Sequence, residues 1–410
     1  YACKRVGCMK PKIAVIGAGA AGLMAAEVLS LYPVSVDVYE HKPTAARKIL
    51  MAGKTGLNIS HSEPFETFVD RYTPNDWLTG YLQSFHADHI VAWMASLGIE
   101  SYIGSSGRIF PVEMKASKLV RAWLSRLNGR GVRFYYRHRC TQISGRVLSF
   151  DKLDAKAELI DSFCANYDAV ILACGGGSYR ALGSDGAWQQ WFDKDLLTPL
   201  YASNVGVLVD WSSFMVPLFG QPLKRIQISV GKKSYQGDVI ISHYGLESGL
   251  IYRLNRAMRC CQKENGFHLS VDLMPDKSVD TIHHILSQTK RKSLNTLLKK
   301  AGLDAVKISI LRECTPKADW SDTAKMAVHI KNLTIQATGF RPIDEAISTG
   351  GGIKRIALGN DLQLIKESGV FCAGEMLDWD APTGGYLLTA CMATGRAAAY
   401  GALQFLNIDQ

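Results

Sequence analysis

Three glycines near the N-terminus have the spacing of a phosphate-binding turn. They occupy positions 17, 19 and 22 of the stretch GAGAAG, directly after the apolar run 12–16. In such a turn the first glycine permits a tight bend, the second lets the backbone approach a pyrophosphate, and the third lets a helix pack closely on a strand. The N–H groups at the start of the following helix then face the phosphates. We expect the pyrophosphate of a dinucleotide to contact Gly17, Gly19, Ala20, Ala21 and Gly22.

The elements around this turn complete a βαβ unit. The run 12–16 predicts a buried parallel strand, residues 23–31 favour a helix, and residues 34–40 predict a second strand that ends at Glu40. Glu40 stands 18 residues after Gly22, where a carboxylate can bind ribose hydroxyls. A GxGxxG turn alone is weak evidence, but with strand, helix and terminal acid in place it predicts dinucleotide binding strongly.

Further glycine-bearing segments favour FAD over NAD. A basic, glycine-bearing loop follows Glu40 at once, where NAD-binding domains usually continue with further βα units. A glycine cluster at 175–177 follows the apolar run 169–173, and another segment follows the run 369–373. Segments far apart in sequence can thus line the binding site of one extended cofactor. In the first two of them we expect cofactor contacts from His41, Arg47, Lys48, Gly53, Gly56, Leu57, Asn58, Ala173, Gly175 and Gly176.

The last segment is GEMLDWDAPTGGYLL, residues 374–388. We expect the strand 369–373 to run parallel to strand 12–16 and to end beside it, and a helix to cover 387–399 with its N-terminus facing the N1–C2=O side of the flavin. A side chain at 384 or 385 would occupy the space of the ring or force an unfavourable φ. The alternative is an ordinary turn at a helix start. The expected contacts are Gly374, Glu375, Asp378, Thr383, Gly384, Gly385 and Tyr386.

We expect the FAD to be bound non-covalently. The two segments that would face the flavin, 52–58 and 381–388, contain neither His nor Cys. FMN would use neither the pyrophosphate turn nor the ribose acid, so it is not the expected cofactor.

The four motifs together resemble one known family. GAGAAG, then ARKILMAGKTGLN, ACGGGSY and AGEMLDWDAPTGGYLL are similar to the YhiN/BaiN-type flavoproteins, FAD-dependent oxidoreductases of which some are described as aminoacetone oxidase-like. The resemblance covers nearly the whole chain from Met9. The family's loop usually reads GGGRCNxTN, whereas this chain has AGKTGLNIS: Gly53, Gly56 and Asn58 are kept, and Gly56-Leu57 replaces an Arg-Cys pair. The chain therefore resembles a divergent branch of the family.

The resemblance also implies a fold class. It is an α/β fold with a Rossmann-like FAD-binding domain, formed by 9–196 and 341–410 around a parallel sheet, and an insertion at 197–340 that holds a small β-barrel and a helical subdomain. Periodicity alone predicts only a mixed insertion. It favours strands at 205–209, 226–230 and 238–242, helices within 279–311, and a strand at 333–337 that returns the chain to the first domain.

Two residues are candidates for acid or base catalysis. His243 lies in ISHYGLESG, which resembles the family's Thr-His-x-Gly-x-Ser-Gly-Pro element; it could instead only structure a turn. Tyr386, like Tyr244, could donate a proton or serve as a packing aromatic. Neither a metal-ligand cluster nor a Ser-His-Asp arrangement stands out in the sequence, so no metal site is predicted.

Composition limits the class of protein. The chain has 410 residues, 47% of them hydrophobic and 20% charged, as in a globular enzyme. Apolar residues 13–31 are interrupted by Glu27, no other run approaches a membrane span, and the cysteines favour a reduced state, so we expect a cytoplasmic protein without membrane contact. Cys3 and Cys8 form a CxxxxC before Met9, in a segment that we interpret as a leader or remnant.

The formal net charge of +10 is uneven. Eight Lys and Arg and no acid lie between 114 and 139. This block is either a solvated helix face or a landing zone for phosphates or an anionic substrate. No nucleic-acid-binding motif supports a nucleic-acid partner.

Two functions follow from these observations. The first is an FAD-dependent oxidoreductase that transfers hydride between flavin N5 and a small organic substrate, with NAD(P)H as a transient donor; reduction of an activated C=C bond and oxidation of a small amine are both open. The second is a non-catalytic flavin-binding protein, redox-responsive or associated with nucleic acid. Only the basic block 114–139 supports it.

Overall fold

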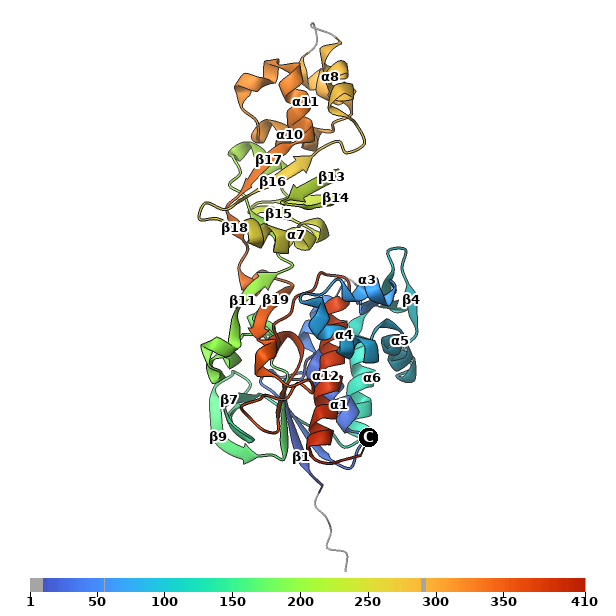
Figure 1. The fold of residues 1–410 in the computed structure, drawn as a ribbon, viewed down its shortest axis with the longest axis vertical. Coiled ribbons are helices and arrows are strands. Elements are labelled where there is room, and N and C mark those ends of the chain that lie inside the picture. The colour runs from blue at the N-terminus through green and yellow to red at the C-terminus, as the bar shows by residue number, and fades with distance from the viewer. Residues whose placement is uncertain (1–9, 55, 289–292, 410) are drawn as a thin grey trace, which may run out of the picture. The chain divides into compact units, whose positions relative to one another are not determined.

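The chain forms two compact units (Figure 1). The computed structural model describes residues 10–54, 56–288 and 293–409, so the expectations for residues 1–8 lie outside the described residues. One unit combines 1–201 with 348–410, and the other is 202–347. The second unit thus interrupts the first in sequence, as an inserted domain does. No helix of the described residues is long and apolar enough to cross a membrane.

A five-stranded parallel sheet forms the centre of the first unit. Its order is β20-β10-β1-β2-β6, and every pairing in it is parallel. Apolar, buried strands of this kind pack helices on both faces. Its strands are β1 (Lys12–Ile16), β2 (Ser35–Glu40), β6 (Arg133–Tyr136), β10 (Ala169–Leu172) and β20 (Val370–Cys372).

The expected place of the last strand is wrong in one respect. β20 runs parallel to β1, but β10 lies between the two and pairs with both. Both β10 and β20 are apolar with 0% exposed surface, so their sequences do not determine which of them lies next to β1. The carboxyl ends of β1, β10 and β20 still meet at one edge, so the glycine motifs that follow them converge.

Two helices pack tightly beside this edge. α1 (Ala20–Leu29) and α12 (Tyr386–Phe405) lie side by side (Figure 1). A Cβ at Gly395 of α12 would stand 2.2 Å from the carbonyl oxygen of Ala21, so glycine is required for this approach. α12 begins one residue before the expected helix and continues beyond 399, because the following residues are mostly apolar, contain no proline, and bury Ala402 and Leu403.

The remaining elements of the first unit surround this core. The helices are α2 (Arg47–Ala52), α3 (Phe65–Val69), α4 (Asn75–Ser84), α5 (Ala87–Ser96) and α6 (Ala116–Gly129). Three small sheets join β3 (Ser60–His61), β4 (Ser101–Ile103) and β5 (Arg108–Pro111); β7 (His138–Ser144), β8 (Val147–Leu153) and β9 (Leu159–Asn166); and β11 (Leu197–Ser203) with β19 (Ser348–Ile353).

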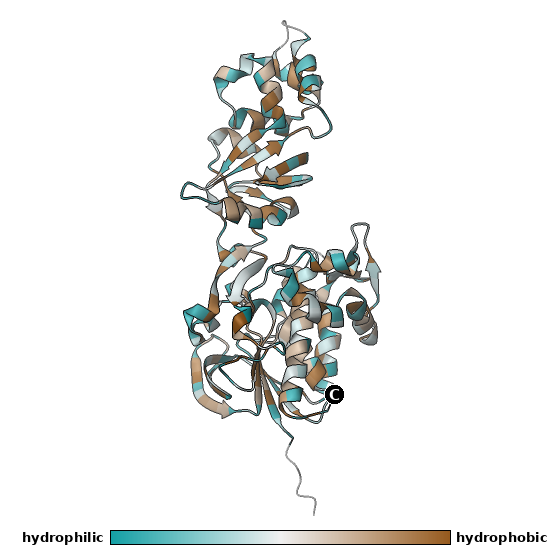
Figure 2. Ribbon diagram, viewed as in Figure 1, coloured by the Kyte–Doolittle hydropathy of each residue, from teal (hydrophilic) through white to brown (hydrophobic). Residues whose placement is uncertain are grey.

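The second unit holds a seven-stranded antiparallel sheet and a helical part. The strand order of this sheet is β17-β16-β13-β14-β15-β12-β18, and among the described residues no pairing joins its outer strands, so the small β-barrel stays a prediction. Figure 2 shows hydrophilic residues, in teal, along the helices. The strands are β12 (Val207–Leu208), β13 (Pro222–Val230), β14 (Lys233–Ser242), β15 (Gly245–Glu247), β16 (Phe267–Asp272), β17 (Leu333–Ala337) and β18 (Gly339–Phe340). The helices are α7 (Gly249–Cys261), α8 (Val279–Ser287), α9 (Leu294–Ala301), α10 (Ala305–Glu313) and α11 (Thr323–Lys331).

The expectation that strand 333–337 returns the chain to the first domain is wrong. This strand is β17, and it pairs antiparallel with β16 along its whole length. Leu333 and Ile335 are buried in the second unit's core while Thr334 is exposed, so one face of the strand belongs to that core. The chain re-enters the first unit at β19 instead.

Part of the basic block 114–139 is structural. Glu27 of α1 accepts hydrogen bonds from the indole of Trp123 and from Arg130, each at 3.0 Å, and Arg126 Nε lies 3.2 Å from the same carboxylate. Arg133 pairs with Asp37 of β2 at 2.6 Å. These arginines therefore bind acids of the βαβ unit and are neither a plain solvated face nor a free landing zone.

Replacing Glu27 with alanine should destabilise the first unit by roughly 2–4 kcal/mol, because the change leaves two arginines and a buried indole without their acceptor. Urea unfolding measures this effect as a lower midpoint. Arg121→Ala, an exposed position on the same helix, is the matched control and should change stability by less than about 0.5 kcal/mol. Equal midpoints for Glu27→Ala and the parent would contradict the structural role of the ion pairs.

Candidate functional site

The glycine turn leaves open space where a phosphate is expected. A Cβ at Gly17, where φ is +102°, would stand 2.3 Å from the carbonyl oxygen of Ala173, and one at Gly22 would stand 1.9 Å from that of Gly17. Both glycines are thus required by the packing of the protein itself. Gly19 differs, because a Cβ there would have no heavy atom within 4 Å. Gly19 caps the N-terminus of α1, whose first residues are Ala20 and Ala21.

Glu40 supports this turn. Its carboxylate accepts the backbone N–H of Ala18 at 3.1 Å and that of Lys42 at 2.9 Å, one on each oxygen. Burial raises the pKa of Glu40, and the two backbone hydrogen bonds partly offset the shift. Each carboxylate oxygen can accept more than one hydrogen bond, so the group can hold the turn and bind a hydroxyl together.

His41 is a neutral imidazole in this setting. Burial lowers the pKa of His41 to about 4, and nearby Asp185 opposes part of the shift. A Cβ at Gly183 would lie 3.2 Å from the imidazole, so the ring is enclosed from that side. At neutral pH His41 therefore carries no charge, and its Nδ1 lies 3.3 Å from Glu40 Oε1.

An ion pair joins three of the glycine-bearing segments. Lys48 Nζ lies 2.8 Å from Glu375 Oε2 and donates to Ser178 Oγ at 2.9 Å. The other oxygen of Glu375 accepts the backbone N–H of Thr349 at 2.8 Å. A Cβ at Gly176 would meet Thr349 at 2.7 Å, so this cluster leaves no room for a side chain there. Lys48 and Glu375, both predicted cofactor contacts, bind each other directly.

Three buried polar atoms at these segments lack a partner among the described residues. They are Arg47 Nε, Asn58 Oδ1 and Ser184 Oγ. Ser184 Oγ would lie 3.0 Å from a Cβ at Gly175, which has a φ of +75°. Buried polar groups in folded proteins nearly always have a hydrogen-bond partner. Together with the open space at Gly19, these atoms fit a polar, extended cofactor such as FAD.

The loop 53–58 is held by the segment before α6. A Cβ at Gly53 would stand 2.4 Å from that of Ala116, and Gly56, at a φ of +143°, lies against the Met114 side chain. The backbone N–H of Leu57, which is fully buried, donates to the Met114 carbonyl at 2.7 Å. The glycines of this loop thus serve packing, and the polar atom that they bring inward is Asn58 Oδ1.

The stretch 374–388 begins at the edge of the parallel sheet where the carboxyl ends of β1, β10 and β20 meet. Gly374, at a φ of +82°, would place a Cβ 2.8 Å from that of Ala21, so this stretch reaches the start of α1. Asp378 accepts a hydrogen bond from Thr198 Oγ1 at 2.6 Å, and Thr383 is half-buried. Gly374 therefore adjoins the start of α1, whereas Asp378 is engaged by a protein side chain.

The double glycine before α12 is explained by the protein itself. Gly384 and Gly385 both have positive φ, +135° and +90°, which is the unfavourable conformation expected for other residues. The expectation that a side chain here would take the space of the flavin ring needs correction. A Cβ at Gly385 would stand 2.4 Å from the backbone nitrogen of Ser60, and one at Gly384 would stand 2.7 Å from the Tyr386 ring.

Tyr386 belongs to a polar network inside an aromatic cluster. Its hydroxyl donates to Glu63 Oε1 at 2.5 Å, and Arg71 binds both oxygens of Glu63 at 3.0 and 2.6 Å. Its ring is stacked on His61, with 5.6 Å between the centroids. Burial and the Glu63 carboxylate raise the pKa of Tyr386, so its hydroxyl stays protonated at neutral pH.

His243 lies in the second unit, apart from these segments in the chain. It is exposed in the turn between β14 and β15. The neighbouring Tyr244 donates to Glu247 and carries the guanidinium of Arg341 4.3 Å from its ring centroid. In the described part of the chain no group of three His, Cys, Asp or Glu could hold a metal ion.

Comparison with known proteins identifies the family. The family model described as "HI0933-like protein Rossmann domain" matches residues 11–401. The chain belongs to this family. The resemblance inferred from the four motifs is thereby confirmed, as is a Rossmann-type α/β fold with a parallel central sheet and additional antiparallel sheets.

Two curated proteins and one solved structure illustrate what this chain is similar to. The chain is 24% identical over 427 residues to the "3-dehydro-bile acid delta(4,6)-reductase" of Clostridium scindens, covering 96% of this chain and 99% of the relative. It is 22% identical over 389 residues to the "Ribosomal RNA dihydrouridine synthase" of Haemophilus influenzae, covering 91% and 93%. The 3-ketosteroid-delta4-(5alpha)-dehydrogenase of Rhodococcus jostii RHA1 has a similar fold, with a TM-score of 0.50, 15% identity, and 98% and 99% of the two chains covered. The HI0933-like protein is an FAD-dependent oxidoreductase.

Sequence reasoning missed the polar residues that fasten the HI0933-like protein's loops together. Five such residues bind or adjoin predicted contacts: Ser178, Ser184, Thr349, Glu63 and Arg71. Of these, only Ser178 lies inside one of the four motifs, ACGGGSY. Ser178 follows the 175–177 cluster directly, which is a weak local signal. Common polar residues in unremarkable sequence give no other sign of such a role.

Gly19→Val should give a folded protein without bound flavin. The added side chain enters open space rather than the protein's own atoms, and Gly19 has an extended backbone that valine adopts readily. Gly129→Val, also in open space, is the matched control and should purify yellow. The absorbance of the purified proteins near 450 nm and their circular dichroism measure the two effects. A yellow Gly19→Val protein with an unchanged flavin spectrum would contradict the assignment of Gly19 to the pyrophosphate site.

His41 should make stability depend on pH. Its folded pKa of about 4 lies below the ordinary value, so its contribution is fully present above about pH 6.5 and is lost as the pH falls towards 4. Between pH 7 and 4.5 the free energy of unfolding should therefore fall by roughly 1–3 kcal/mol more in the parent than in His41→Gln. Urea titrations at both pH values measure the difference, and parallel losses in the two proteins would refute it.

Proposed function

We propose that this protein is an FAD-dependent reductase that saturates an activated C=C bond, with NAD(P)H as the hydride source. The observation that carries the proposal is the open space at Gly19 together with three partnerless buried polar atoms: Arg47 Nε and Asn58 Oδ1 on predicted contacts, and Ser184 Oγ beside Gly175. The relatives' names select the direction of the chemistry. A delta(4,6)-reductase reduces a conjugated bond, and dihydrouridine is a pyrimidine nucleoside with its C=C bond saturated.

The residues of this site would have distinct roles in holding FAD. The N-terminus of α1 at Gly19 would take the pyrophosphate, because free N–H groups and the helix dipole favour anions. Glu40 would bind the adenosine ribose, and Arg47, Asn58 and Ser184 would direct their partnerless atoms to the cofactor. The start of α12 after Gly385 would face the flavin ring. FAD, when bound, supplies hydride transfer at N5.

Reduction of a C=C bond also needs a proton on the carbon that hydride does not reach. Tyr386 is the better candidate to hold it, because its hydroxyl is protonated and fixed towards Glu63. Arg71 keeps that carboxylate ionised: burial alone would raise the pKa of Glu63, but the hydrogen bonds from Arg71 and Tyr386 bring it below its usual value. His243, exposed on the second unit, is the other candidate.

Two other functions are less well supported. Oxidation of a small amine has no counterpart in the names of the relatives reported above. A flavin-binding module without turnover depended on the basic block 114–139, and three arginines of that block bind acids of the protein.

An anaerobic visible spectrum tests the proposal in two halves. NADH or NADPH should bleach the flavin, and a cyclic conjugated enone should then restore the colour. Tyr386→Phe should leave the bleaching intact and slow the recovery about 10²- to 10⁴-fold, the usual effect of losing a general acid. His243→Gln is the parallel variant and should leave both halves unchanged.

Each outcome separates the candidates. Bleaching by an amine but not by NAD(P)H would replace the reductase with an oxidase, and no bleaching by either would favour the flavin-binding module. Slow recovery in His243→Gln and normal recovery in Tyr386→Phe would move the proton donor to the second unit.

A further inference from the structure

The positive charge of the chain is concentrated in the second unit. Residues 202–347 contain 20 Lys and Arg and 13 Asp and Glu, whereas the rest of the chain contains 27 and 24. The second unit therefore carries +7 of the net +10 in about a third of the residues. This excess of positive charge lies outside the block 114–139, which is the most conspicuous run of cations in the sequence.

Helix α7 presents much of this charge on one face. Arg253, Arg256 and Cys260 are exposed and follow the i, i+3, i+7 spacing of a single helix face, and Lys263 is exposed just beyond the last turn. No acid occurs from 248 to 263. A single basic residue in the last turn would satisfy the helix dipole, so this row exceeds what helix stability needs.

Contacts along α7 bring a second basic segment beside it. The helix lies along β14, since Leu250 is next to Gly237 and the guanidinium of Arg253 lies 3.7 Å from the centroid of the Tyr235 ring. At the far end Cys261 Sγ lies 3.5 Å from the Cβ position of Gly231, in the turn between β13 and β14. The exposed residues of that turn and of the helix form one patch. The α7 basic surface consists of Lys232, Lys233, Arg253, Arg256 and Lys263.

Three acids of the second unit pair with cations outside this surface. Asp319 pairs with Lys325 and His329, Asp272 pairs with Lys331, and Glu345 pairs with Arg341. Within the described residues no ion pair involves Lys232, Lys233, Arg253 or Lys263. These four cations repel one another because no acid of the described residues is paired with them. An external polyanion would therefore stabilise the surface.

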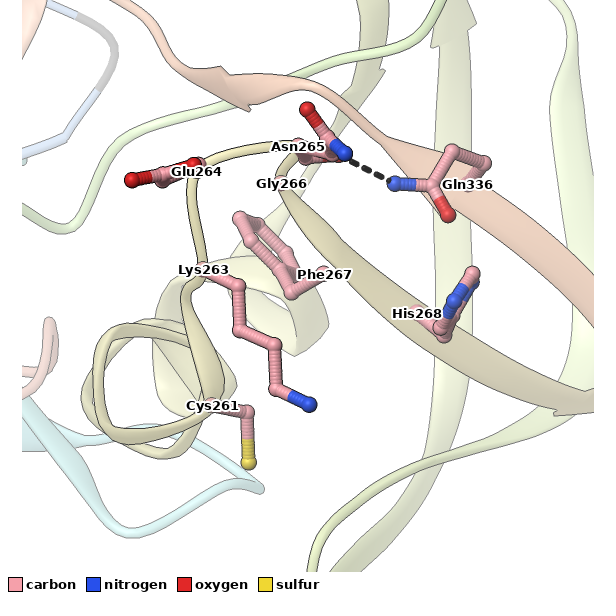
Figure 3. Close-up of a pocket in the computed structure, with 8 residues that line it drawn as sticks. All are labelled: Cys261, Lys263, Glu264, Asn265, Gly266, Phe267, His268 and Gln336. Carbon is pink, nitrogen blue, oxygen red and sulfur yellow. Dashed lines mark hydrogen bonds between the residues drawn. The ribbon is translucent and has the colours of Figure 1, made fainter.

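A hollow lined by both polar and apolar residues continues this surface. It has a volume of about 820 Å³ and shares Cys261 and Lys263 with the end of α7. Figure 3 shows its amide and imidazole groups from β16 and β17: Gln336 lies across from His268 and donates to the carbonyl of Asn265 at 2.7 Å. The one acid there, Glu264, points away from Lys263 and His268 in this view. The volume falls in the range of small-ligand sites and is sufficient for a nucleotide.

We propose that the α7 basic surface and this hollow bind single-stranded RNA. The cations would follow the phosphate backbone, and the amides and imidazole of the hollow would meet the polar edges of an unstacked nucleotide and its 2′-hydroxyl. An anionic membrane would also attract the cations, but it needs apolar side chains among them. The exposed large hydrophobic residues of the described second unit, Phe214, Val216, Val279, Val328 and Ile347, lie on other segments. The proposal does not depend on the reductase chemistry.

The test is fluorescence anisotropy of a labelled oligouridylate of about 20 nucleotides, titrated with the full, FAD-loaded protein between about 50 and 200 mM NaCl. The parent should bind in the range of about 10⁻⁴ to 10⁻⁶ M with a steep salt dependence. In the triple variant Lys233→Gln, Arg253→Gln, Lys263→Gln the slope of log K against log salt should fall by about 2, since each lost contact removes about 0.7 on single strands.

The control variant removes the same charge elsewhere. Arg121→Gln, Lys299→Gln, Lys317→Gln changes three exposed cations outside the surface and should keep the parent's affinity and slope. Equal loss in both variants, or absence of RNA binding, would overturn the proposal. Equal binding of the matching DNA would overturn the choice of RNA, and binding to phosphatidylserine vesicles in its place would favour a membrane. The bleaching of the flavin by NAD(P)H, measured on the same samples, shows separately whether the reductase proposal stands.

Discussion

Backbone packed directly on backbone at the start of α1 is the constraint on which the first unit depends. Gly17 meets the carbonyl of Ala173, Gly22 meets that of Gly17, and Gly395 meets that of Ala21, each closer than a Cβ would allow. This packing draws the ends of β1, β10 and α12 together, although these segments are far apart in sequence. It also leaves Gly19 as the one glycine of the turn with space in front of it. The same packing therefore builds the domain and forms the cradle.

An ion pair also stabilises the contact between the segments that the glycines allow to pack closely. The ion pair of Lys48 and Glu375 spans more than three hundred residues of sequence and lies at the edge where the strands end. Breaking a largely buried pair of this kind leaves an uncompensated charge, so it favours one arrangement of the two segments of the unit over others. An insertion between the segments is tolerated because packing and this pair, rather than chain continuity, hold the unit closed.

The fold of the first unit was predictable because glycine spacing reports backbone geometry. Three local patterns each favour the same structure. They are the GxGxxG turn, the strand that ends at Glu40 and the small-residue helix after 385. The place of β20 was not predictable in the same way, since β10 and β20 are both short apolar strands and periodicity does not order them in a sheet. The Tyr386, Glu63 and Arg71 network was not predictable either, because its members are brought together only by the tertiary fold.

Charge is where sequence alone misleads most. The block 114–139 contains more cations in succession than α7, yet Arg126, Arg130 and Arg133 meet acids supplied by α1 and β2. The row on α7 is shorter, but no acid occurs from 248 to 263, and Asp319, Asp272 and Glu345 pair with other cations. The cations of a segment can be counted from its sequence. A charged partner responds only to the cations that remain uncompensated by acids after folding. Because compensation is a tertiary property, the surface that can attract an anion is identified from the second unit's ion pairs and not from its sequence.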